Sequence, residues 1–411
     1  MTGAPHCRFC GAGLTRSLVD LGTTPLANSY LSEAQLAKPE PRFPLHARVC
    51  GQCRLVQVEA AATPAEIFSD YAYFSSVSSS WVEHARRFAA MARTRWHLGA
   101  ASRVVEIASN DGYLLKHFVA MGVPVLGVEP AANVARAAIA ADVPTEIAFF
   151  GRATAERLNA ASQAADLLVG NNVFAHVPDI NDFVAGLAIL LKPEGVISLE
   201  FPHLLRLIEQ VQFDTIYHEH FSYLSLLASD RILAAHGLRV FDVEELPTHG
   251  GSLRLLACHR GARHAEGPGL DKVRRDEKSA GLDTDAGYAG FEPRVKKVRD
   301  GLLVFLRGAK AAGKTVAAYG AAAKGNTLLN YCGIGADLIA SVVDRSPHKQ
   351  GLYLPGSHLP IHPPDYLATT RPNYVLILPW NLKDEIMGSM AHIRDWGGRF
   401  VVAIPELALL D

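Results

Sequence analysis

Apolar and polar positions alternate in a regular order along the middle of the chain. Short apolar runs bounded by turn residues are separated by alanine-rich stretches of helical length; the runs are Arg103–Ile107, Pro124–Val128, Asp166–Val169 and Val196–Phe201. Such alternation predicts parallel strands with helices on both faces of the sheet. The sequence therefore predicts a doubly wound α/β domain, preceded by a serine-capped helix that starts near Ser80 and ends near Leu98.

A second series of the same kind follows in the C-terminal part of the chain. Its predicted strands are Lys314–Tyr319, Leu338–Val343, Tyr374–Leu378 and Phe400–Ile404. Between the two series, Leu238–Glu245 and Ser252–Ala257 read as strands joined by a turn at 249–251. The charge-rich segment Asp271–Asp300 shows little apolar periodicity in its first half and predicts a solvated helical connector. Two Rossmann-like domains in one chain are therefore predicted.

Four of the six cysteines form two C-x2-C pairs, Cys7 with Cys10 and Cys50 with Cys53. Two such pairs can hold one zinc ion in a tetrahedral, closed site, so a structural metal is predicted. The alternative is disulfides or free thiols, and a reducing cytosol disfavours the disulfides. The turn-rich residues between the pairs suggest a small β-rich zinc domain. The predicted domains are 1–70, a cofactor-binding domain over 71–245, and a second Rossmann-like domain over 246–411.

Composition and charge narrow the classes of function. The chain of 411 residues is 49% apolar and 20% charged, with a formal net charge of −1. A globular protein without a global basic field is not expected to bind nucleic acid or an anionic membrane surface. No apolar run approaches the roughly 20 residues that a membrane span needs, and the first residues lack a secretory pattern. A cytoplasmic enzyme is predicted; its oligomeric state is left open.

The loop after the first predicted strand is the first candidate ligand site. Its residues are Glu106, Ala108, Ser109, Asn110, Asp111 and Gly112. Small residues let backbone amides approach a ligand at the switch point of a doubly wound sheet. The run is not G-x-G-x-x-G, and its carboxylate would repel phosphates but accept an ammonium or sulfonium. Glu129, followed by Pro130, ends the second strand where a ribose diol would bind, and Asn171 and Asn172 follow the predicted strand Asp166–Val169. Together these features predict a class I S-adenosylmethionine (SAM) methyltransferase; a doubly wound domain with another ligand is the alternative.

A second small-residue loop lies in the C-terminal series. It contributes Tyr319, Ala323, Lys324, Gly325 and Asn326, and Asp344 ends the next strand. A lysine without a carboxylate, at the start of a helix, suits an anion such as a phosphate. Asp344 would then hold a ribose or sugar hydroxyl. The loop therefore predicts a cradle for a nucleotide or nucleotide-sugar, and plain helix–sheet packing is the alternative.

The segment Tyr217-His218-Glu219-His220 concentrates groups that can move protons. Histidine commonly titrates near neutral pH and can remove a proton from a substrate. A nearby carboxylate would orient the ring, and tyrosine could donate to a developing oxyanion. A metal site is the alternative, but no cysteine or further carboxylate stands at helical ligand spacing. The segment therefore predicts general acid–base chemistry.

These motifs, in this order, resemble the deoxysugar C-methyltransferases that act on nucleotide-linked 4-keto-6-deoxysugars in antibiotic and surface-polysaccharide pathways. The resemblance covers essentially the whole chain. It rests on the four cysteines, the segment Tyr71–Trp81, Glu106–Gly112, Asn171–Asp179, Tyr217–His220 and Tyr319–Asn330. It implies a structural zinc domain, SAM in the middle domain, and the nucleotide-sugar in the C-terminal domain.

The resemblance also implies residue roles. His220 would be the general base that takes a proton from C3 of a 4-keto sugar, and Tyr217, with His176, would hydrogen-bond the C4 oxygen as it becomes an enolate. Glu219 would position His220 or bind a polar group of the substrate. Tyr71, Tyr73 and Ser75 would contact the substrate. The alternatives are methylation at C5, a non-catalytic sugar-nucleotide-binding protein, and an O- or N-methyltransferase of a small metabolite; His176 could instead only shape the SAM pocket.

Overall fold

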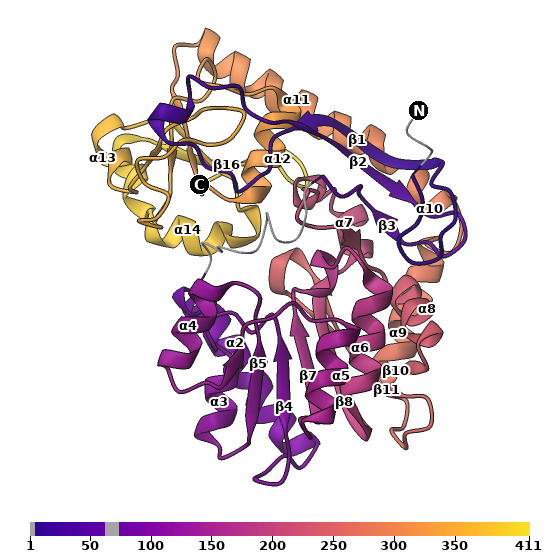
Figure 1. Ribbon diagram of the computed structural model, residues 1–411. Coiled ribbons are helices and arrows are strands. Elements are labelled where there is room, and N and C mark those ends of the chain that lie inside the picture. Colours follow the sequence, from indigo (N-terminus) through magenta and orange to yellow (C-terminus); the bar gives the residue numbers. More distant parts are fainter. Residues whose placement is uncertain (1–4, 62–73) are drawn as a thin grey trace. The chain divides into compact units, whose positions relative to one another are not determined.

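The computed structural model describes residues 5–61 and 74–411, and Figure 1 traces them as a ribbon. The chain forms two compact units. Unit 1 comprises Met1–Leu14, Cys50–His203 and Phe221–Asp283. Unit 2 comprises Thr15–Val49, Leu204–His220 and Thr284–Asp411. Each unit is therefore assembled from three separate stretches of the chain.

A seven-stranded sheet forms the centre of unit 1, in the order β10-β11-β8-β7-β4-β5-β6. Its strands are β4 (Val104–Ile107), β5 (Val125–Val128), β6 (Thr145–Glu146), β7 (Ala165–Asn171), β8 (Leu191–Pro202), β10 (Leu238–Leu246) and β11 (Ser252–His259). The strands from β8 to β6 are parallel, and β11 runs antiparallel to both β8 and β10. Because β4 lies between β5 and β7, the loops after these three strands open at one edge of the sheet.

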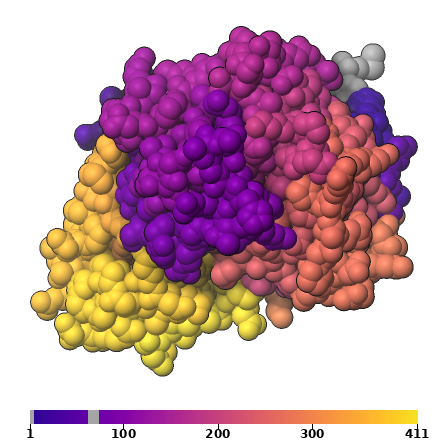
Figure 2. Space-filling view, turned by 90° about the horizontal axis from the view of Figure 1, so that it is seen from below, coloured from indigo at the N-terminus to yellow at the C-terminus, as the bar shows by residue number. Residues whose placement is uncertain are grey.

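Helices connect and cover the strands of unit 1 (Figure 1). They are α2 (Ser79–Arg95), α3 (Leu115–Ala120), α4 (Ala132–Ala140), α5 (Arg152–Ala160), α6 (Ile180–Leu190), α8 (Leu226–Ala235) and α9 (Pro268–Ser279). The violet atoms of the first strands and helices form one continuous surface in Figure 2. A short antiparallel pair, β3 (Val56–Gln57) with β9 (Ser222–Tyr223), completes the unit.

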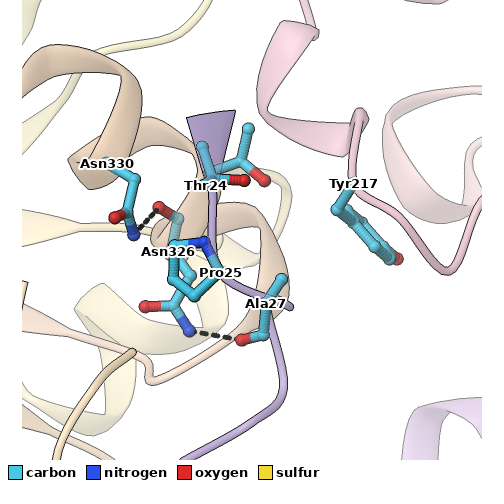
Figure 3. Close-up of a pocket in the computed structure, with 7 residues that line it drawn as sticks. Thr24, Pro25, Ala27, Tyr217, Asn326 and Asn330 are labelled. Atoms are coloured by element: carbon cyan, nitrogen blue, oxygen red, sulfur yellow. Dashed lines mark hydrogen bonds between the residues drawn. The ribbon is translucent and has the colours of Figure 1, made fainter. Parts of the chain in front are cut away.

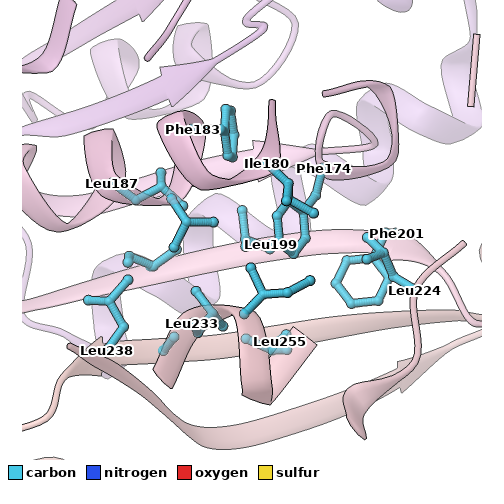
Figure 4. Close-up of a cluster of buried hydrophobic side chains, with 14 of the residues drawn as sticks. Phe174, Ile180, Phe183, Leu187, Leu199, Phe201, Leu224, Leu233, Leu238 and Leu255 are labelled. Carbon is cyan, nitrogen blue, oxygen red and sulfur yellow. The ribbon is translucent and has the colours of Figure 1, made fainter. Parts of the chain in front are cut away.

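The largest core of unit 1 lies between α6, α8 and the strands β8, β10 and β11. Figure 4 shows Phe174, Phe183, Leu199 and Phe201 pointing into this core. Helix α6 is apolar nearly all round, because both faces are covered, with Ile180, Val184 and Leu187 among its buried residues. Each such side chain contributes about 1.5–3 kcal/mol when it is fully buried. The core fixes the strand ends that carry the cofactor loop.

Unit 2 contains a six-stranded sheet in the order β14-β13-β12-β15-β16-β17. The strands are β12 (Val316–Tyr319), β13 (Val342–Val343), β14 (Ile361–His362), β15 (Tyr374–Ile377), β16 (Arg399–Val402) and β17 (Ala408–Leu410). All are parallel except β17, which runs antiparallel to β16. The next strands along the chain, β13 and β15, pair with opposite edges of β12. The carboxyl end of β12 is therefore the switch point, where ligands bind in open α/β sheets.

The helices of unit 2 include one long member, α11, beside several short ones. They are α7 (Leu204–Glu209), α10 (Ala286–Ala289), α11 (Phe291–Ala311), α12 (Ala323–Cys332), α13 (Tyr366–Thr370) and α14 (Lys383–Ser389). An antiparallel pair, β1 (Arg16–Thr24) with β2 (Phe43–Val49), also belongs to this unit. Both α11 and α12 contact β1, so this N-terminal strand packs on the helices that directly precede and follow β12.

The predicted fold class is confirmed: a doubly wound sheet and a second Rossmann-like sheet stand where the apolar runs predicted them. The predicted division at residue 245 falls near the end of β10, which pairs with β11, and unit 1 extends to Asp283. The hairpin of β1 and β2, predicted as part of the zinc domain, lies in unit 2. In the described part of the chain, no helix is long and apolar enough to cross a membrane.

The segment Asp271–Asp300 is helical as predicted, but α9 is not a solvated connector. It buries Leu270, Val273 and Glu277 on one face. The Glu277 carboxylate accepts hydrogen bonds from His203 Nε2 at 2.7 Å and from the backbone N–H groups of Leu226 and Leu227 at 2.6 and 2.8 Å. The charge pattern was misleading here, because one glutamate on the buried face binds the open N–H groups at the start of α8.

Candidate active site

The four paired cysteines come together in unit 1. Their four sulfur atoms all lie within 4.8 Å of one another, and the Cys7–Cys53 and Cys10–Cys50 pairs are each 3.5 Å apart. Tetrahedral zinc with sulfur ligands at about 2.3 Å places the sulfurs about 3.8 Å apart, so the donor set fits zinc.

Two similar turns produce this arrangement. Gly11 donates its N–H to the Cys7 carbonyl, and Arg54 donates to the Cys50 carbonyl. Both residues have positive φ, 73° and 64°. Gln57 adds a hydrogen bond from Nε2 to the Cys7 sulfur at 3.2 Å, a contact of the kind that orients a metal ligand. The prediction that these four cysteines form one metal cluster is therefore supported by geometry, and the closed set leaves no open position for catalysis.

The predicted cofactor loop follows β4 in a tight left-handed turn. Ala108, Asn110 and Gly112 have φ values of 55°, 51° and 76°. A Cβ on Gly112 would lie 3.0 Å from Val143 Cγ2, so a side chain there would meet both strain and crowding. Three positive-φ residues in a run of five mark a backbone shaped for close approach of a ligand.

The loop is closed from one side by the short 3-10 turn η2 (Ser75–Val77). The Ser75 N–H donates to Asn110 Oδ1 at 2.9 Å, and both the N–H and the hydroxyl of Ser76 donate to Asp111 Oδ2, at 3.1 and 2.5 Å. Ser75, predicted to contact the substrate, thus contacts the cofactor loop. Tyr71 and Tyr73, given the same role, lie outside the described residues.

Three carboxylates, those of Glu106, Asp111 and Glu129, line this loop, and Glu106 is fully buried. Glu106 is 0% exposed, and its carboxylate lies beside the Tyr113 hydroxyl. Burial raises its pKa well above the usual range, the Tyr113 hydroxyl opposes this rise, and the negative charges of Glu129 and Asp111 add to it. Such a group gains from a cationic partner, since a buried charge without one is costly. An ammonium or sulfonium ligand fits this loop better than a phosphate does.

Glu129 stands directly after β5, as predicted, with 5% of its surface exposed. Its Oε2 accepts from the Asn110 N–H at 2.9 Å and its Oε1 from the Ala131 N–H at 2.8 Å. Burial raises its pKa, partly offset by these two hydrogen bonds. Each carboxylate oxygen keeps a second lone pair, so a diol could still be bound. Pro130 separates Glu129 from the helix α4.

Asn171 and Asn172 lie at the end of β7, beside the loop. Asn171 Nδ2 donates to the Tyr113 hydroxyl at 3.1 Å, and Asn172 Nδ2 lies 3.2 Å from His249 Nε2. The side-chain oxygens of both asparagines are buried without a hydrogen-bond partner in the described part of the chain. These two oxygens are therefore acceptors available to a ligand.

His176 lies in the 3-10 turn η3 (Phe174–His176) and is half-buried. Asp179, three residues on, caps α6 by accepting from the Asp182 N–H at 3.0 Å. The aspartate of this His-x-x-Asp pattern thus has a capping role. The catalytic role of His176 stays a prediction.

Sequence reasoning missed a buried polar cluster beside the cofactor loop. Glu200, on β8, is 0% exposed and accepts hydrogen bonds from His84 at 2.9 Å and from Arg254 at 2.8 Å. Burial alone would raise the pKa of Glu200, but His84 and Arg254 lower it overall. The Trp81 ring stacks on His84 with ring centroids 4.9 Å apart. The cluster ties the start of α2 to the sheet, and its members are too far apart in sequence to be found from spacing.

Replacing Glu129 by alanine is expected to weaken SAM binding by roughly 1–3 kcal/mol, because charge-assisted hydrogen bonds to the ribose are lost. Calorimetric titration of the purified protein with SAM measures this change. Glu129→Gln should lose less, since one carbonyl oxygen remains. The exposed Glu156 of α5 provides a matched Glu→Ala control. Equal losses for SAM and for a nucleotide-sugar titrated in parallel would contradict the assignment.

In unit 2, the predicted acid–base segment forms a short chain of hydrogen bonds. Tyr217 and His220 are joined by a 2.9 Å contact between the hydroxyl and Nε2, and their ring centroids are 4.1 Å apart. His220 Nδ1 lies 3.0 Å from the Thr215 carbonyl oxygen. A carbonyl can only accept, so Nδ1 carries the hydrogen and Nε2 of the neutral ring is the acceptor. Nε2 is therefore the nitrogen that can take a proton.

The other two residues of the segment have different surroundings. His218 is 1% exposed, and its Nε2 lies 3.1 Å from the Pro44 carbonyl. Burial lowers its pKa, which favours the neutral ring, so His218 anchors the segment to β2. Asn28 Nδ2 donates to both carboxylate oxygens of Glu219, each at 2.8 Å. Burial raises the pKa of Glu219 to about 7, although the Asn28 hydrogen bond opposes the shift.

A small pocket lies where this segment meets the N-terminus of α12. It is lined by Thr24, Pro25, Ala27, Tyr217, Asn326, Thr327 and Asn330. Figure 3 shows Tyr217 on the opposite side of the pocket from Asn326 and Asn330. Asn326 Nδ2 donates to the Ala27 carbonyl, and Thr327 Oγ1 donates to the Ile216 carbonyl at 3.1 Å. Asn326, predicted to bind substrate, and its neighbour Thr327 thus connect α12 to the two other stretches of unit 2.

The predicted anion loop follows β12. Gly320 has φ 96°, and a Cβ there would lie 2.5 Å from Pro379 Cδ, so only glycine fits this turn. Gly325 is also confined, since a Cβ would lie 2.6 Å from Leu378 Cδ1. Ala323 and Lys324 begin α12, and Tyr319 is the last residue of β12. The loop is therefore both tightly packed and placed at the switch point of the sheet.

Lys324 has a polar environment that the sequence did not suggest. Its Nζ donates to Asn381 Oδ1 at 3.0 Å and lies 5.0 Å from the centre of the Trp380 ring. Trp380 Nε1 donates to Asp214 Oδ2 at 2.8 Å. Burial raises the pKa of Asp214 to about 6, and the charge of Lys324 limits that rise. A lysine and a titrating carboxylate thus share one buried cluster.

Asp344 follows β13, as predicted. Its Oδ2 accepts from the Ala321 N–H at 2.7 Å and its Oδ1 from the Ser346 N–H at 2.8 Å. The carboxylate therefore holds the anion loop in place, and any contact with a sugar hydroxyl would use its remaining lone pairs.

Comparisons with known proteins agree with this description. Three family models match the chain: one described as "Putative zinc binding domain" over residues 7–68, a methyltransferase domain over 81–243, and a C-methyltransferase C-terminal domain over 247–405. The chain is 38% identical over 401 residues to the C-methyltransferase NovU of Streptomyces niveus, a match that covers 98% of this chain and 96% of that protein.

More distant relatives match only part of the chain. A ubiquinone biosynthesis O-methyltransferase of Rhodopseudomonas palustris is 24% identical over 165 residues, which cover 34% of this chain and 65% of that protein. The solved structure of magnesium protoporphyrin IX methyltransferase from Synechocystis with bound SAM is 13% identical, covers 45% of this chain and 82% of that one, and has a TM-score of 0.34. This last likeness is too distant to bear on the site.

The near full-length match and the three family models agree with the residues described above. The four-cysteine cluster lies inside the zinc-binding model, and the cofactor loop lies inside the methyltransferase model. Zinc and SAM are accordingly the metal and the methyl donor of this enzyme. The chain belongs to the family of SAM-dependent C-methyltransferases that carry an N-terminal zinc-binding domain and a distinctive C-terminal domain.

Proposed function

We propose that this enzyme methylates C3 of a nucleotide-linked 4-keto-6-deoxysugar, with thymidine diphosphate as the expected nucleotide. The observation that carries the proposal is the hydrogen-bonded chain from Tyr217 through His220 to the Thr215 carbonyl. When the His220 ring is neutral, this arrangement leaves Nε2 unprotonated with a phenol beside it, in the same unit as the anion loop of Lys324. A base next to a hydrogen-bond donor suits proton removal beside a ketone.

The deprotonation step is assigned to His220. Its Nε2 takes the proton from C3, and the electron pair of the C–H bond passes into the enolate whose oxygen is on C4. The Thr215 carbonyl would stabilise the imidazolium that forms, because it accepts from Nδ1–H throughout. Tyr217, which contacts Nε2 in this structure, would turn its hydroxyl to the C4 oxygen once substrate is bound.

Bound SAM supplies an electrophilic methyl group, so that C3 gains a C–C bond as the carbon–sulfur bond breaks. The chain's own residues contribute alignment of the two reactants, which can account for much of the barrier lowering in such a transfer. Glu219, whose pKa of about 7 allows it to be protonated at neutral pH, is assigned to a polar group of the sugar. Asn28 holds it there.

The substrate is tested with a panel of thymidine-, uridine- and guanosine-linked 4-keto-6-deoxysugars, both 3-hydroxy and 3-amino. The methylated product is located by carbon NMR with labelled SAM. Label on C3 supports the proposal. Label on C5, on oxygen or on nitrogen would replace it with one of those reactions, and binding without turnover of any sugar would favour a non-catalytic protein.

Substitution of Lys324 by alanine is expected to raise the KM for the nucleotide-sugar roughly tenfold or more, because a charge-assisted contact to phosphate is lost. SAM affinity should not change, since the cofactor loop belongs to unit 1. Steady-state kinetics with each substrate varied in turn provides the measurement. Lys383→Ala, an exposed lysine of unit 2, is the matched control. An unchanged KM for the sugar would leave the loop as ordinary packing.

A further inference from the structure

A second lysine, Lys349, reaches the anion loop from the segment after β13. Its Nζ donates to the Ala321 carbonyl at 2.7 Å and lies 5.4 Å from the centre of the Tyr30 ring. Tyr30 donates its own hydroxyl to the same carbonyl, also at 2.7 Å. The lysine side chain keeps 27% of its surface exposed. Two residues distant in sequence thus converge on one carbonyl of the loop.

Lys349 is a cation with incomplete pairing. An ammonium has three donors, but among the described residues Lys349 makes a hydrogen bond only to Ala321. Its nearest carboxylate oxygen, Asp344 Oδ2, is 3.8 Å away and already accepts from the Ala321 N–H. Burial lowers the pKa of Lys349, and it lowers that of Lys324 in the same way. Two cations that are costly to keep charged therefore flank one loop.

The backbone of the loop adds donors to these two cations. Helix α12 has ten residues and begins at Ala323. The N–H groups of Ala323, Lys324 and Gly325 lie in its first turn and therefore have no intrahelical acceptor. At Gly320 the backbone turns tightly and passes close to Pro379, so little space is left between the end of β12 and Pro379. A helix start with open amides and two nearby lysines favours an anion that carries more than one charge.

We infer that Lys349 is the second cationic contact of a diphosphate subsite, in which Lys324 and the first amides of α12 provide the other contacts. The inference rests on the proposed nucleotide-sugar substrate and deepens it. A nucleoside diphosphate has two phosphates to neutralise, and Lys324 alone is a single charge that also interacts with Asp214. Tyr30 keeps Lys349 beside the loop through the ring contact.

The test compares nucleoside monophosphates and diphosphates as calorimetric ligands of the full-length protein. Thymidine, uridine and guanosine series are titrated into wild type, Lys349→Ala and Lys349→Gln, and the ratio of the two dissociation constants is taken within each series. The ratio is independent of how the base is recognised. Lys314→Ala removes the same charge at an exposed position of unit 2 and is the matched control. Thermal unfolding of each variant reports on folding.

Wild type and Lys314→Ala should bind the best diphosphate more tightly than its monophosphate, and Lys349→Ala should weaken diphosphate binding roughly 10- to 100-fold while monophosphate binding changes little. Lys349→Gln should behave like the alanine variant at an unchanged unfolding temperature. An intact ratio in both variants, or equal losses for both ligands, would overturn the inference and leave the proposed function standing. A wild-type protein that binds no nucleotide would contradict both.

Discussion

His220→Asn is expected to reduce kcat by roughly 10²–10⁴-fold, because the variant lacks the nitrogen that we propose accepts the C3 proton. Asparagine can still donate toward the Thr215 carbonyl, so the local hydrogen bonding of the segment is largely kept. Both SAM and the nucleotide-sugar should bind with near wild-type affinity. The loss therefore appears in turnover rather than in KM, which identifies a role in the chemical step.

Solvent exchange provides a second readout for the same variant. If wild type exchanges the C3 hydrogen of the sugar with deuterium oxide in the absence of SAM, His220→Asn should suppress that exchange. Tyr217→Phe should be milder, since it removes a donor to the enolate and leaves the base in place. His348→Asn, at an exposed histidine of unit 2, controls for the substitution itself. Near wild-type methylation by His220→Asn would contradict the assignment of His220 as the base, and Glu219 would be the next residue to test.

Cys50→Ser is expected to destabilise the whole protein rather than to impair one kinetic step. The four sulfurs form a closed site, and structural zinc contributes on the order of 10 kcal/mol to the folding of small zinc domains. A domain has only about 5–15 kcal/mol of net stability, so loss of one ligand should reduce solubility and lower the unfolding temperature strongly. Cys50 is buried in the same core cluster as Leu55, which adds to the effect.

The measurement combines metal analysis with thermal unfolding. Freshly purified wild type should contain about one zinc per chain, and a strong chelator should lower its unfolding temperature. Cys258→Ala, at a buried cysteine outside the cluster, should keep its zinc and lose much less stability. Protein that is free of zinc when first purified, yet folded, would contradict the prediction.

Much of the fold could be predicted from the sequence, because its strands are short apolar runs between clear turn residues. The loops after β4 and β12 were also predictable, since ligand loops of doubly wound sheets follow particular strands. The partners of the site residues were not. Asn28 contacts Glu219 across 191 positions of sequence, and Asn326 contacts Ala27 across 299. A single asparagine in a turn-rich stretch looks the same whether it caps a turn or contacts a residue of the candidate site.

Lys349 and Asp214 illustrate the same limit for charged residues. Both lie in segments with ordinary polar composition, and only the folded chain shows that one reaches Ala321 and the other lies beside Lys324. The error at Glu277 is the reverse. Its charge was taken to indicate exposure to solvent, but the side chain is buried. The periodicity of apolar residues reports which faces are covered, but it gives no information on polar groups that are buried with a partner.

The chain passes several times between its two units, and this limits which segments can be exchanged between related enzymes. The chain crosses from one unit to the other at residues 14/15, 49/50, 203/204, 220/221 and 283/284. A chimaera joined near residue 246, where the family models change, would exchange β12 to β17 but would inherit Leu204–His220 and the β1–β2 hairpin from the other parent. The proposed base, His220, and the proposed sugar-binding loop of Lys324 would then come from different parent enzymes. Exchange of sugar specificity within this family is therefore expected to require three segments to be transplanted together.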